Sequence, residues 1–170
     1  MKRHFIVISM TVLALVCLVF GQSDKTAHSQ MGAGGSHIMM TANDVKWGPG
    51  PPALPPGVQI ALLEGDPTKA GSSYVMRAKM PDGYKIQPHW HPGTENVTVL
   101  EGSFYLGMGE KFDQSAGREL TPGGFASMTK GTRHFAWTKG ETVIQVHGVG
   151  PFEIIYLNPA DDPRKKASPK

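Results

Sequence analysis

Cysteine is almost absent from this chain, which has one such residue, Cys17, among 170. Because Cys17 falls within an apolar N-terminal run, the rest of the chain has no thiol and cannot form an internal disulfide. The stability of the fold must therefore come from a hydrophobic core. Any metal site must likewise use histidine and carboxylate ligands in place of sulfur.

An excess of charge of one sign is also missing. The chain has 17 basic and 14 acidic residues, and loss of an N-terminal segment carrying Lys2 and Arg3 would leave a net charge of about +1. Nucleic-acid binding usually needs a clustered basic face. The basic residues near the C-terminus lie in a proline-containing tail instead. We therefore expect no nucleic-acid partner.

Long hydrophobic runs are limited to residues 5–20. Lys2, Arg3 and His4 precede this run and Gly21 follows it, which is the charged, apolar and small-residue order of a secretory signal. The run has about 16 residues, fewer than the roughly 20 that span a bilayer. We expect residues 1–21 to be a cleaved signal peptide, with no stable membrane span after processing and a periplasmic or secreted location.

Helical periodicity is missing as well. From residue 58 onward the chain consists of short runs rich in β-branched and aromatic residues, separated by turn pairs such as Asp82-Gly83, Glu101-Gly102 and Lys139-Gly140. The expected strands are 58–63, 73–80, 84–91, 95–100, 104–108, 125–129, 134–138, 142–147 and 152–157. Many short strands without intervening helices predict an all-β sandwich or barrel.

The remaining segments set the expected domain limits. Residues 22–41 are polar and glycine-rich, which favours a flexible linker. Residues 42–159 are long enough for one β-barrel domain with its own core, and residues 160–170 form a polar tail. The proline-rich stretch 47–57 predicts an extended arm that packs on the barrel, with a dimer contact as one role for it.

Three residues in one short stretch indicate a metal site. His89 and His91 are two residues apart, so on a strand they point to the same face, with Cα atoms about 6.6 Å apart. Two imidazoles can share one ion across that gap. Pro92-Gly93 then bends the chain, which lets Glu95 return its carboxylate toward the same point.

A third imidazole is available about 40 residues further on. The turn at Gly131 presents His134 at the start of the next expected strand. Three neutral imidazoles and one carboxylate suit a divalent transition metal (Mn, Fe, Zn, Ni or Cu) better than the all-oxygen sites of Ca or Mg.

These two stretches resemble the two motifs of the cupin superfamily. The first motif is matched at Gly83, His89, His91, Glu95 and Gly102, and the second at Gly123, Gly131 and His134. The chain departs from the second motif at Thr129, where proline is usual, and at Thr138, where asparagine is common; neither position is a metal ligand. The resemblance covers about residues 42–159. It implies a cupin-type double-stranded β-helix, or jelly-roll, barrel with the ion near its centre, and it allows a homodimer.

The leading hypothesis for function is a metal-dependent enzyme that acts on a small organic molecule. The resemblance favours oxidation or dioxygenation of an enol or phenol, and isomerisation or lyase chemistry is the next choice. It also implies that Glu95 can leave the metal and act as a catalytic base. The alternative is a non-catalytic periplasmic module that binds or senses a metal or small ligand. Gln145 and His147 share one strand face and are candidates for the cavity wall, with His147 either a proton shuttle or a structural histidine.

The signal-peptide hypothesis makes one direct prediction. Mass spectrometry of protein taken from the cell envelope should give an N-terminus near Gln22, because a signal peptidase cuts after a small residue such as Gly21. An intact Met1 in that fraction would contradict cleavage and favour a permanent anchor.

Overall fold

The computed structural model describes residues 37–166. The expected signal peptide (1–21) and most of the expected linker (22–41) lie outside this range. The elements are η1 (Ala42–Asp44), β1 (Gly48–Pro49), β2 (Gln59–Gly65), β3 (Ser73–Met80), β4 (Lys85–Trp90), β5 (Glu95–Met108), η2 (Gln114–Ala116), β6 (Gly117–Leu120), β7 (Phe125–Met128), β8 (His134–Val149), β9 (Ile155–Tyr156), η3 (Pro159–Asp161) and α1 (Pro163–Lys166).

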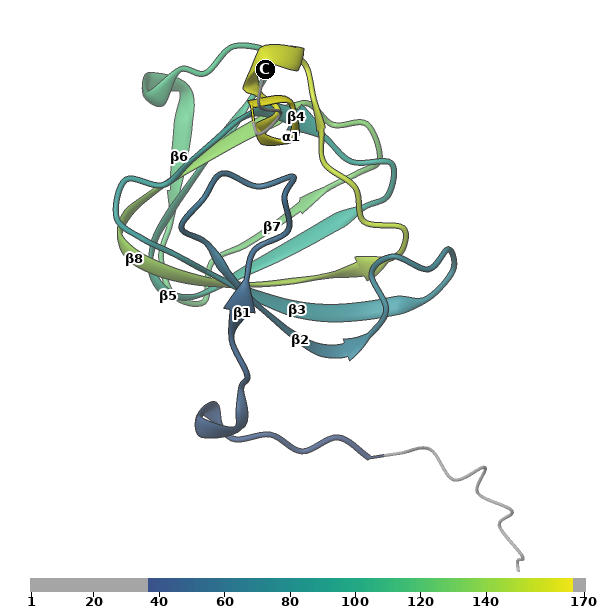
Figure 1. Cartoon of the computed structure of the whole chain (residues 1–170). Coiled ribbons are helices and arrows are strands. Elements are labelled where there is room, and N and C mark those ends of the chain that lie inside the picture. The colour runs from purple at the N-terminus through teal and green to yellow at the C-terminus, as the bar shows by residue number, and fades with distance from the viewer. Residues whose placement is uncertain (1–36, 167–170) are drawn as a thin grey trace, which may run out of the picture. The chain divides into compact units, whose positions relative to one another are not determined.

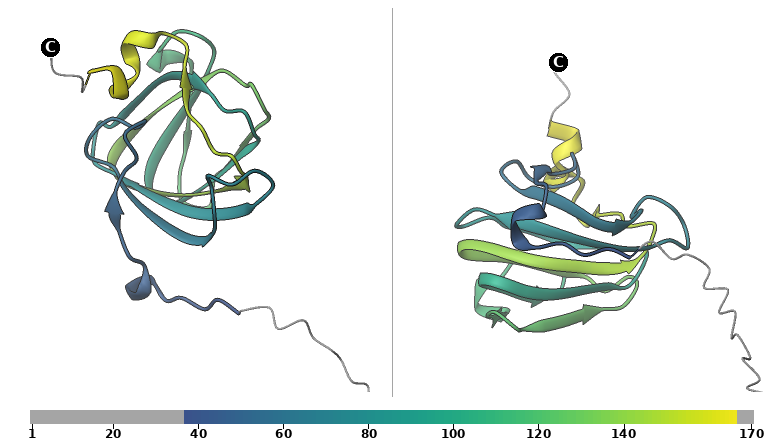
Figure 2. Two further views of the ribbon diagram at one scale, coloured as in Figure 1. Left: turned by 45° about the vertical axis from the view of Figure 1, so that its right-hand side comes forward. Right: turned by 90° about the horizontal axis from the view of Figure 1, so that it is seen from below.

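One nine-stranded antiparallel sheet curls around a central space (Figure 1). The path β1-β2-β3-β8-β4-β9 forms most of it, and β5 pairs with β6, β7 and β8. The β5–β8 ladder is the longest, running from Glu95 opposite Gly148 to Met108 opposite His134. The second view of Figure 2 shows these strands stacked beside β3 and β2. The expectation of an all-β barrel is confirmed.

Alternation along the strands places one face of each toward the interior. In β3 the buried positions are every second residue, and they include Tyr74 and Met76. The first half of β5 alternates in the same way, so Glu95 stands in one inward row with Val97 and Val99. This alternation, typical of a half-buried strand, explains why a carboxylate at the start of β5 is buried.

Two of the expected strand ends are wrong. The pairs Glu101-Gly102 and Lys139-Gly140 do not separate strands; they lie inside β5 and β8, which run through them as single strands of 14 and 16 residues. Gly102 (φ 76°) and Gly140 (φ 74°) adopt the left-handed backbone conformation, and the pairing register shifts on both sides of Glu101. Glycine tolerates such a conformation at little cost, so each strand bends around the barrel while the ladder continues.

A second apolar cluster lies outside the barrel interior. Phe135 and Trp137 stack with ring centroids 6.1 Å apart, and Phe112 packs against both rings. Two glycines make the room: a Cβ on Gly107 would meet the Phe135 ring at 2.2 Å, and one on Gly117 would meet Trp137 at 1.9 Å. Gly117 begins β6, a strand that sequence periodicity does not predict.

The proline-rich stretch 47–57 forms only a two-residue strand, β1, before it loops over one end of the barrel. Two tyrosine hydroxyls hold this loop, since Tyr84 donates to the carbonyl of Pro55 and Tyr156 to that of Ala53 (2.5 and 2.9 Å). The expected polar tail begins with η3 and α1, where Arg164 donates to the carbonyl of Ile154 at 3.1 Å. Within residues 37–166 no helix is long and apolar enough to cross a membrane.

The outer cluster should contribute strongly to stability. Phe135 is fully buried, so Phe135→Ala should lower the free energy of unfolding by about 3–5 kcal/mol. Phe125 is a matched control, because it is 56% exposed and its truncation should change stability by less than about 0.5 kcal/mol. Urea denaturation followed by circular dichroism measures both; equal losses in the two variants would contradict this packing.

Candidate metal centre

The four predicted ligands come together where three strands begin or end. His89 is the fifth residue of β4 and pairs in register with His134, the first residue of β8. His91 follows β4 directly, and Glu95 is the first residue of β5. The backbone N–H of Gly131 donates to the carbonyl of His91 at 2.9 Å, so the turn that presents His134 is tied to the segment that carries His91.

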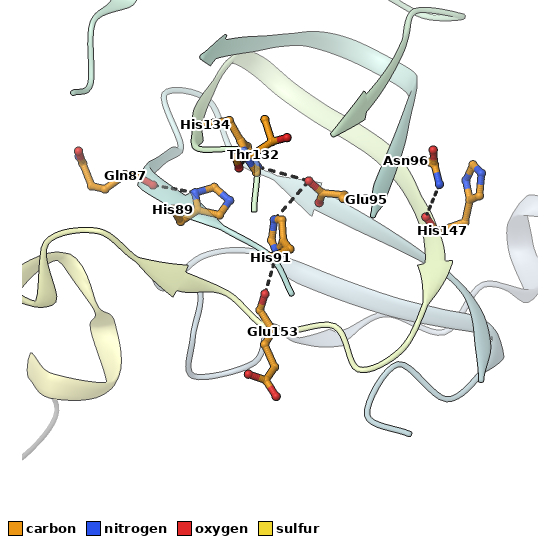
Figure 3. A network of polar contacts seen from close by, with 9 residues as sticks. All are labelled: Gln87, His89, His91, Glu95, Asn96, Thr132, His134, His147 and Glu153. Carbon is orange, nitrogen blue, oxygen red and sulfur yellow. Dashed lines mark hydrogen bonds and ion pairs between the residues drawn. The ribbon is translucent and has the colours of Figure 1, made fainter. Parts of the chain in front are cut away.

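Each of the three imidazole rings is oriented by a backbone carbonyl (Figure 3). The Nδ1 atom of His89 donates to Gln87 O at 2.7 Å and that of His134 to Thr132 O at 2.9 Å, in both cases two residues back along the chain. The Nδ1 atom of His91 donates to Glu153 O at 2.7 Å, across the barrel opening. Since a carbonyl can only accept, Nδ1 carries the proton in each neutral ring, and Nε2 keeps its lone pair.

The ring nitrogens that remain converge on one point. One nitrogen from each of His89, His91 and His134 lies within 4.8 Å of the other two, and all three side chains are at most 4% exposed. The Nε2 atom of His91 is buried without a hydrogen-bond partner. Among the described residues it is the single buried side-chain polar atom in that condition. A buried lone pair of this kind is costly unless a cation or a proton meets it.

Glu95 stands beside this group. Its Oε2 atom is 3.3 Å from His91 Nε2 and 3.4 Å from His134 Nε2. A carboxylate oxygen facing two nitrogen lone pairs is repulsive unless positive charge lies between them. The arrangement of three imidazoles and a carboxylate therefore fits a divalent transition metal, with Glu95 at the edge of the histidine group.

The electrostatics of the site separate the histidines. Burial, with His134 and His91 close by, lowers the pKa of His89 to about 3. Burial would also lower the pKa of His91, but the Glu95 carboxylate outweighs it and raises that pKa above its ordinary value. Burial alone would raise the pKa of Glu95, yet His91 and His134 hold it well below its usual range. His91 is thus a ring at which a proton competes with a metal.

The surroundings of the site are apolar and tight. A cavity of about 50 Å³ borders His89, His91 and Glu95, and a second of about 30 Å³ borders His89, Glu95 and His134. Phe152 stacks on the His91 ring with centroids 4.7 Å apart. Sequence reasoning did not find the roles of Phe152 and of the Glu153 carbonyl, because both depend on where the segment after β8 returns to the barrel.

Gln145 and His147 do not line the cavity. Their neighbours Ile144 and Val146 do, so the two polar side chains point to the outer face of β8. There Arg77 donates to Gln145 at 3.3 Å. Figure 3 shows His147 turned away from the three site histidines. The sequence already indicated this orientation, because the apolar residues at 144 and 146 alternate with Gln145 and His147 and occupy the inward positions of the strand.

The two departures from the cupin motif have local structural roles. The hydroxyl of Thr138 donates to the carbonyl of Pro81 at 2.7 Å and accepts from the backbone N–H of Tyr84 at 3.0 Å. Thr129 and Thr132 share a hydroxyl hydrogen bond of 3.2 Å within the turn before His134. Neither change removes a group from the histidine cluster.

Several solved structures are similar to this chain in fold. Among solved structures, the polyketide cyclase RemF from Streptomyces resistomycificus is similar with a TM-score of 0.57 and 19% identity, over 76% of this chain and 91% of that one. A candidate acetylacetone dioxygenase from Methylibium petroleiphilum PM1 gives 0.57 and 19%, over 75% and 85%. An RmlC-like cupin from Ralstonia eutropha JMP134 gives 0.53 and 25%, over 73% and 74%.

These likenesses concern the fold. No curated protein matches the chain. The sequence model of the ChrR cupin-like domain, in contrast, matches residues 35–153, which is most of the chain and includes all four predicted ligands. The chain therefore belongs to the ChrR cupin-like domain family of the cupin superfamily.

Proposed function

We propose that this chain is an exported cupin that holds one divalent transition-metal ion through His89, His91, His134 and Glu95. The observation that carries the proposal is the convergence of one buried nitrogen from each of His89, His91 and His134. The Nε2 atom of His91 has no hydrogen-bond donor facing it, and its ring is fixed from behind by the carbonyl of Glu153. Outer hydrogen bonds of this type to metal-binding histidines fix the tautomer and raise ligand basicity. Mn, Fe, Zn, Ni and Cu all accept such a ligand set.

We further propose that the loaded site is an enzyme acting on a small organic molecule. A bound ion of this class supplies Lewis-acid or redox chemistry. The barrel residues exclude bulk water, and Glu95 lies at the edge of the cluster, where it can bind the ion or hold a proton as a base. Similar folds include a polyketide cyclase and a candidate acetylacetone dioxygenase, so oxidation, dioxygenation or isomerisation are the reactions to test first.

A second function is favoured by one observation. The cavity beside the histidines measures only about 50 Å³, whereas small-molecule pockets usually measure roughly 300–1,000 Å³. A tight site suits a periplasmic module that binds or senses a metal or small ligand without turnover. Oxygen uptake or product formation with enols and phenols, in wild type against His91→Ala, separates the two functions.

Removal of a ligand should remove the metal. His91→Ala and His134→Ala each delete one imidazole from the cluster, so metal affinity should fall by more than about tenfold. His147→Ala is the matched control, because His147 lies on the outer face of β8 and should leave the metal content unchanged. Elemental analysis of identically prepared proteins measures all three. Equal metal content in wild type and His91→Ala would show that this cluster is not the site.

Metal affinity should also depend on pH in a defined direction. Because the pKa of His91 is raised by Glu95, a proton on His91 competes with the metal at and above the ordinary histidine pKa of about 6.5. Affinity should therefore fall about tenfold per pH unit once the pH drops below the His91 pKa, and this loss should begin at a higher pH than for an ordinary histidine.

Competition titrations between pH 5 and pH 8 measure this dependence. Glu95→Gln is the informative variant, since it removes the charge that raises the His91 pKa and should move the onset of the loss to lower pH. If the loss of affinity began at the same pH in Glu95→Gln as in wild type, the role given to the Glu95 carboxylate would be contradicted.

A further inference from the structure

Two residues line both the cavity beside the histidines and a groove on the outside of the barrel. The outer groove measures about 400 Å³ and runs between the proline-rich loop and the start of α1. The inner cavity measures about 50 Å³ and ends at His89, His91 and Glu95. Leu54 and Val58 are the residues common to both linings, so their side chains lie between the outer groove and the inner cavity.

These two wall residues differ in how firmly they are held. Val58 is buried and accepts a hydrogen bond from the N–H of Gly50 at 3.0 Å, and its side chain fills the place of a Cβ on Gly50. Leu54 lies at the middle of residues 51–57, the loop that this Gly50–Val58 bond closes at its base. The two ends of this loop therefore lie side by side at the edge of the sheet, as in other compact surface loops.

Few bonds hold this loop against the barrel. The hydroxyls of Tyr84 and Tyr156 donate to the carbonyls of Pro55 and Ala53, and the N–H of Leu54 is satisfied within the loop by Pro51 O at 2.9 Å. The four prolines restrict the backbone, so few torsions within the loop are free to change. Figure 1 shows the loop in front of the ring of strands.

The chamber behind Leu54 has one chemical character. Apart from the site residues and the hydroxyl of Tyr84, its lining is apolar. Among the residues that line it, Glu95 is the one with an acidic side chain, and no lysine or arginine is present. An anionic ligand would find no cationic side chain there, so only the bound ion could offset its desolvation.

We propose that Leu54 is the gate between the outer groove and the metal site, and that it sets the size of the ligand. The ligand is a largely apolar molecule with an oxygen atom that faces the histidines. Its chemical class rests on the proposed function, whereas the gate rests on the two linings alone. A cavity of about 50 Å³ holds only a few water molecules, so an organic ligand needs more room, which displacement of the Leu54 side chain would open.

The gate can be tested on metal-free protein labelled with ¹³C at the methionine methyl groups. Met76 and Met80 line the chamber, whereas Met108 is 53% exposed on the outside and reports non-specific binding. Benzyl alcohol is the neutral probe, and benzoate is an anion of the same size. We expect benzyl alcohol to bind at least tenfold more tightly to Leu54→Ala than to wild type, as measured from the shifts of the Met76 and Met80 signals. Benzoate should shift neither signal in the metal-free protein.

One variant is a control for truncation of a leucine, and a second variant tests the loop itself. Leu62→Ala truncates a leucine that is 51% exposed on β2 and should bind benzyl alcohol as wild type does. Tyr84→Phe keeps Leu54 but removes one loop bond, so it should tighten binding in the same direction as Leu54→Ala. Equal affinity in wild type and Leu54→Ala, or no shift in either, would overturn the gate. In the metal-free protein, binding of benzoate as tight as that of benzyl alcohol would overturn the apolar character of the inner cavity.

The metal proposal is judged separately by metal content. If Leu54→Ala tightens the binding of benzyl alcohol but the wild-type protein holds no metal, the gate proposal stands and the metal-dependent function does not. If the protein holds metal but shows no Leu54 effect, the reverse applies.

Discussion

The structure depends on one electrostatic constraint, the convergence of buried electron-pair donors at the centre of a barrel. Three imidazole nitrogens and a carboxylate oxygen meet where the nearest other groups are hydrocarbon. In such surroundings unpaired donors are expensive and their mutual repulsion is poorly screened. A cation resolves both problems at once, and the carbonyl partners of the three Nδ1 atoms ensure that the rings offer lone pairs and not protons.

The two bent strands make this convergence possible. β5 and β8 pair along almost their whole length, so the first residue of β8 lies opposite the last residue of β5, and the first residue of β5 lies near the end of β8. β4 pairs with the first half of β8 and brings His89 beside His134. Bends at Gly102 and Gly140 allow one ladder to pass around the barrel, and the ligands therefore come from strand ends that rigid pairing holds in place.

The apolar lining gives the site its chemical limits. Hydrocarbon walls strengthen any interaction between a bound ion and its ligands, because little water competes for them. Without a bound ion, the same walls admit an uncharged molecule more readily than an anion. Access then depends on a loop that two tyrosine hydroxyls hold, which places control of entry outside the histidine cluster itself.

The sequence by itself determined the fold class and the residues that meet at the centre. Short alternating runs indicate strands without tertiary information, and the one-residue spacing of His89 and His91 already places them on one side of the chain. Three features depended on the tertiary structure: β5 and β8 are continuous, His147 faces outward, and the Glu153 carbonyl orients His91. Strand continuity depends on pairing with distant segments, since a glycine that ends an isolated strand can bend a paired one. The carbonyl of Glu153 has no side-chain signature, and only the return of the chain to the barrel opening, 62 residues after His91, places it there.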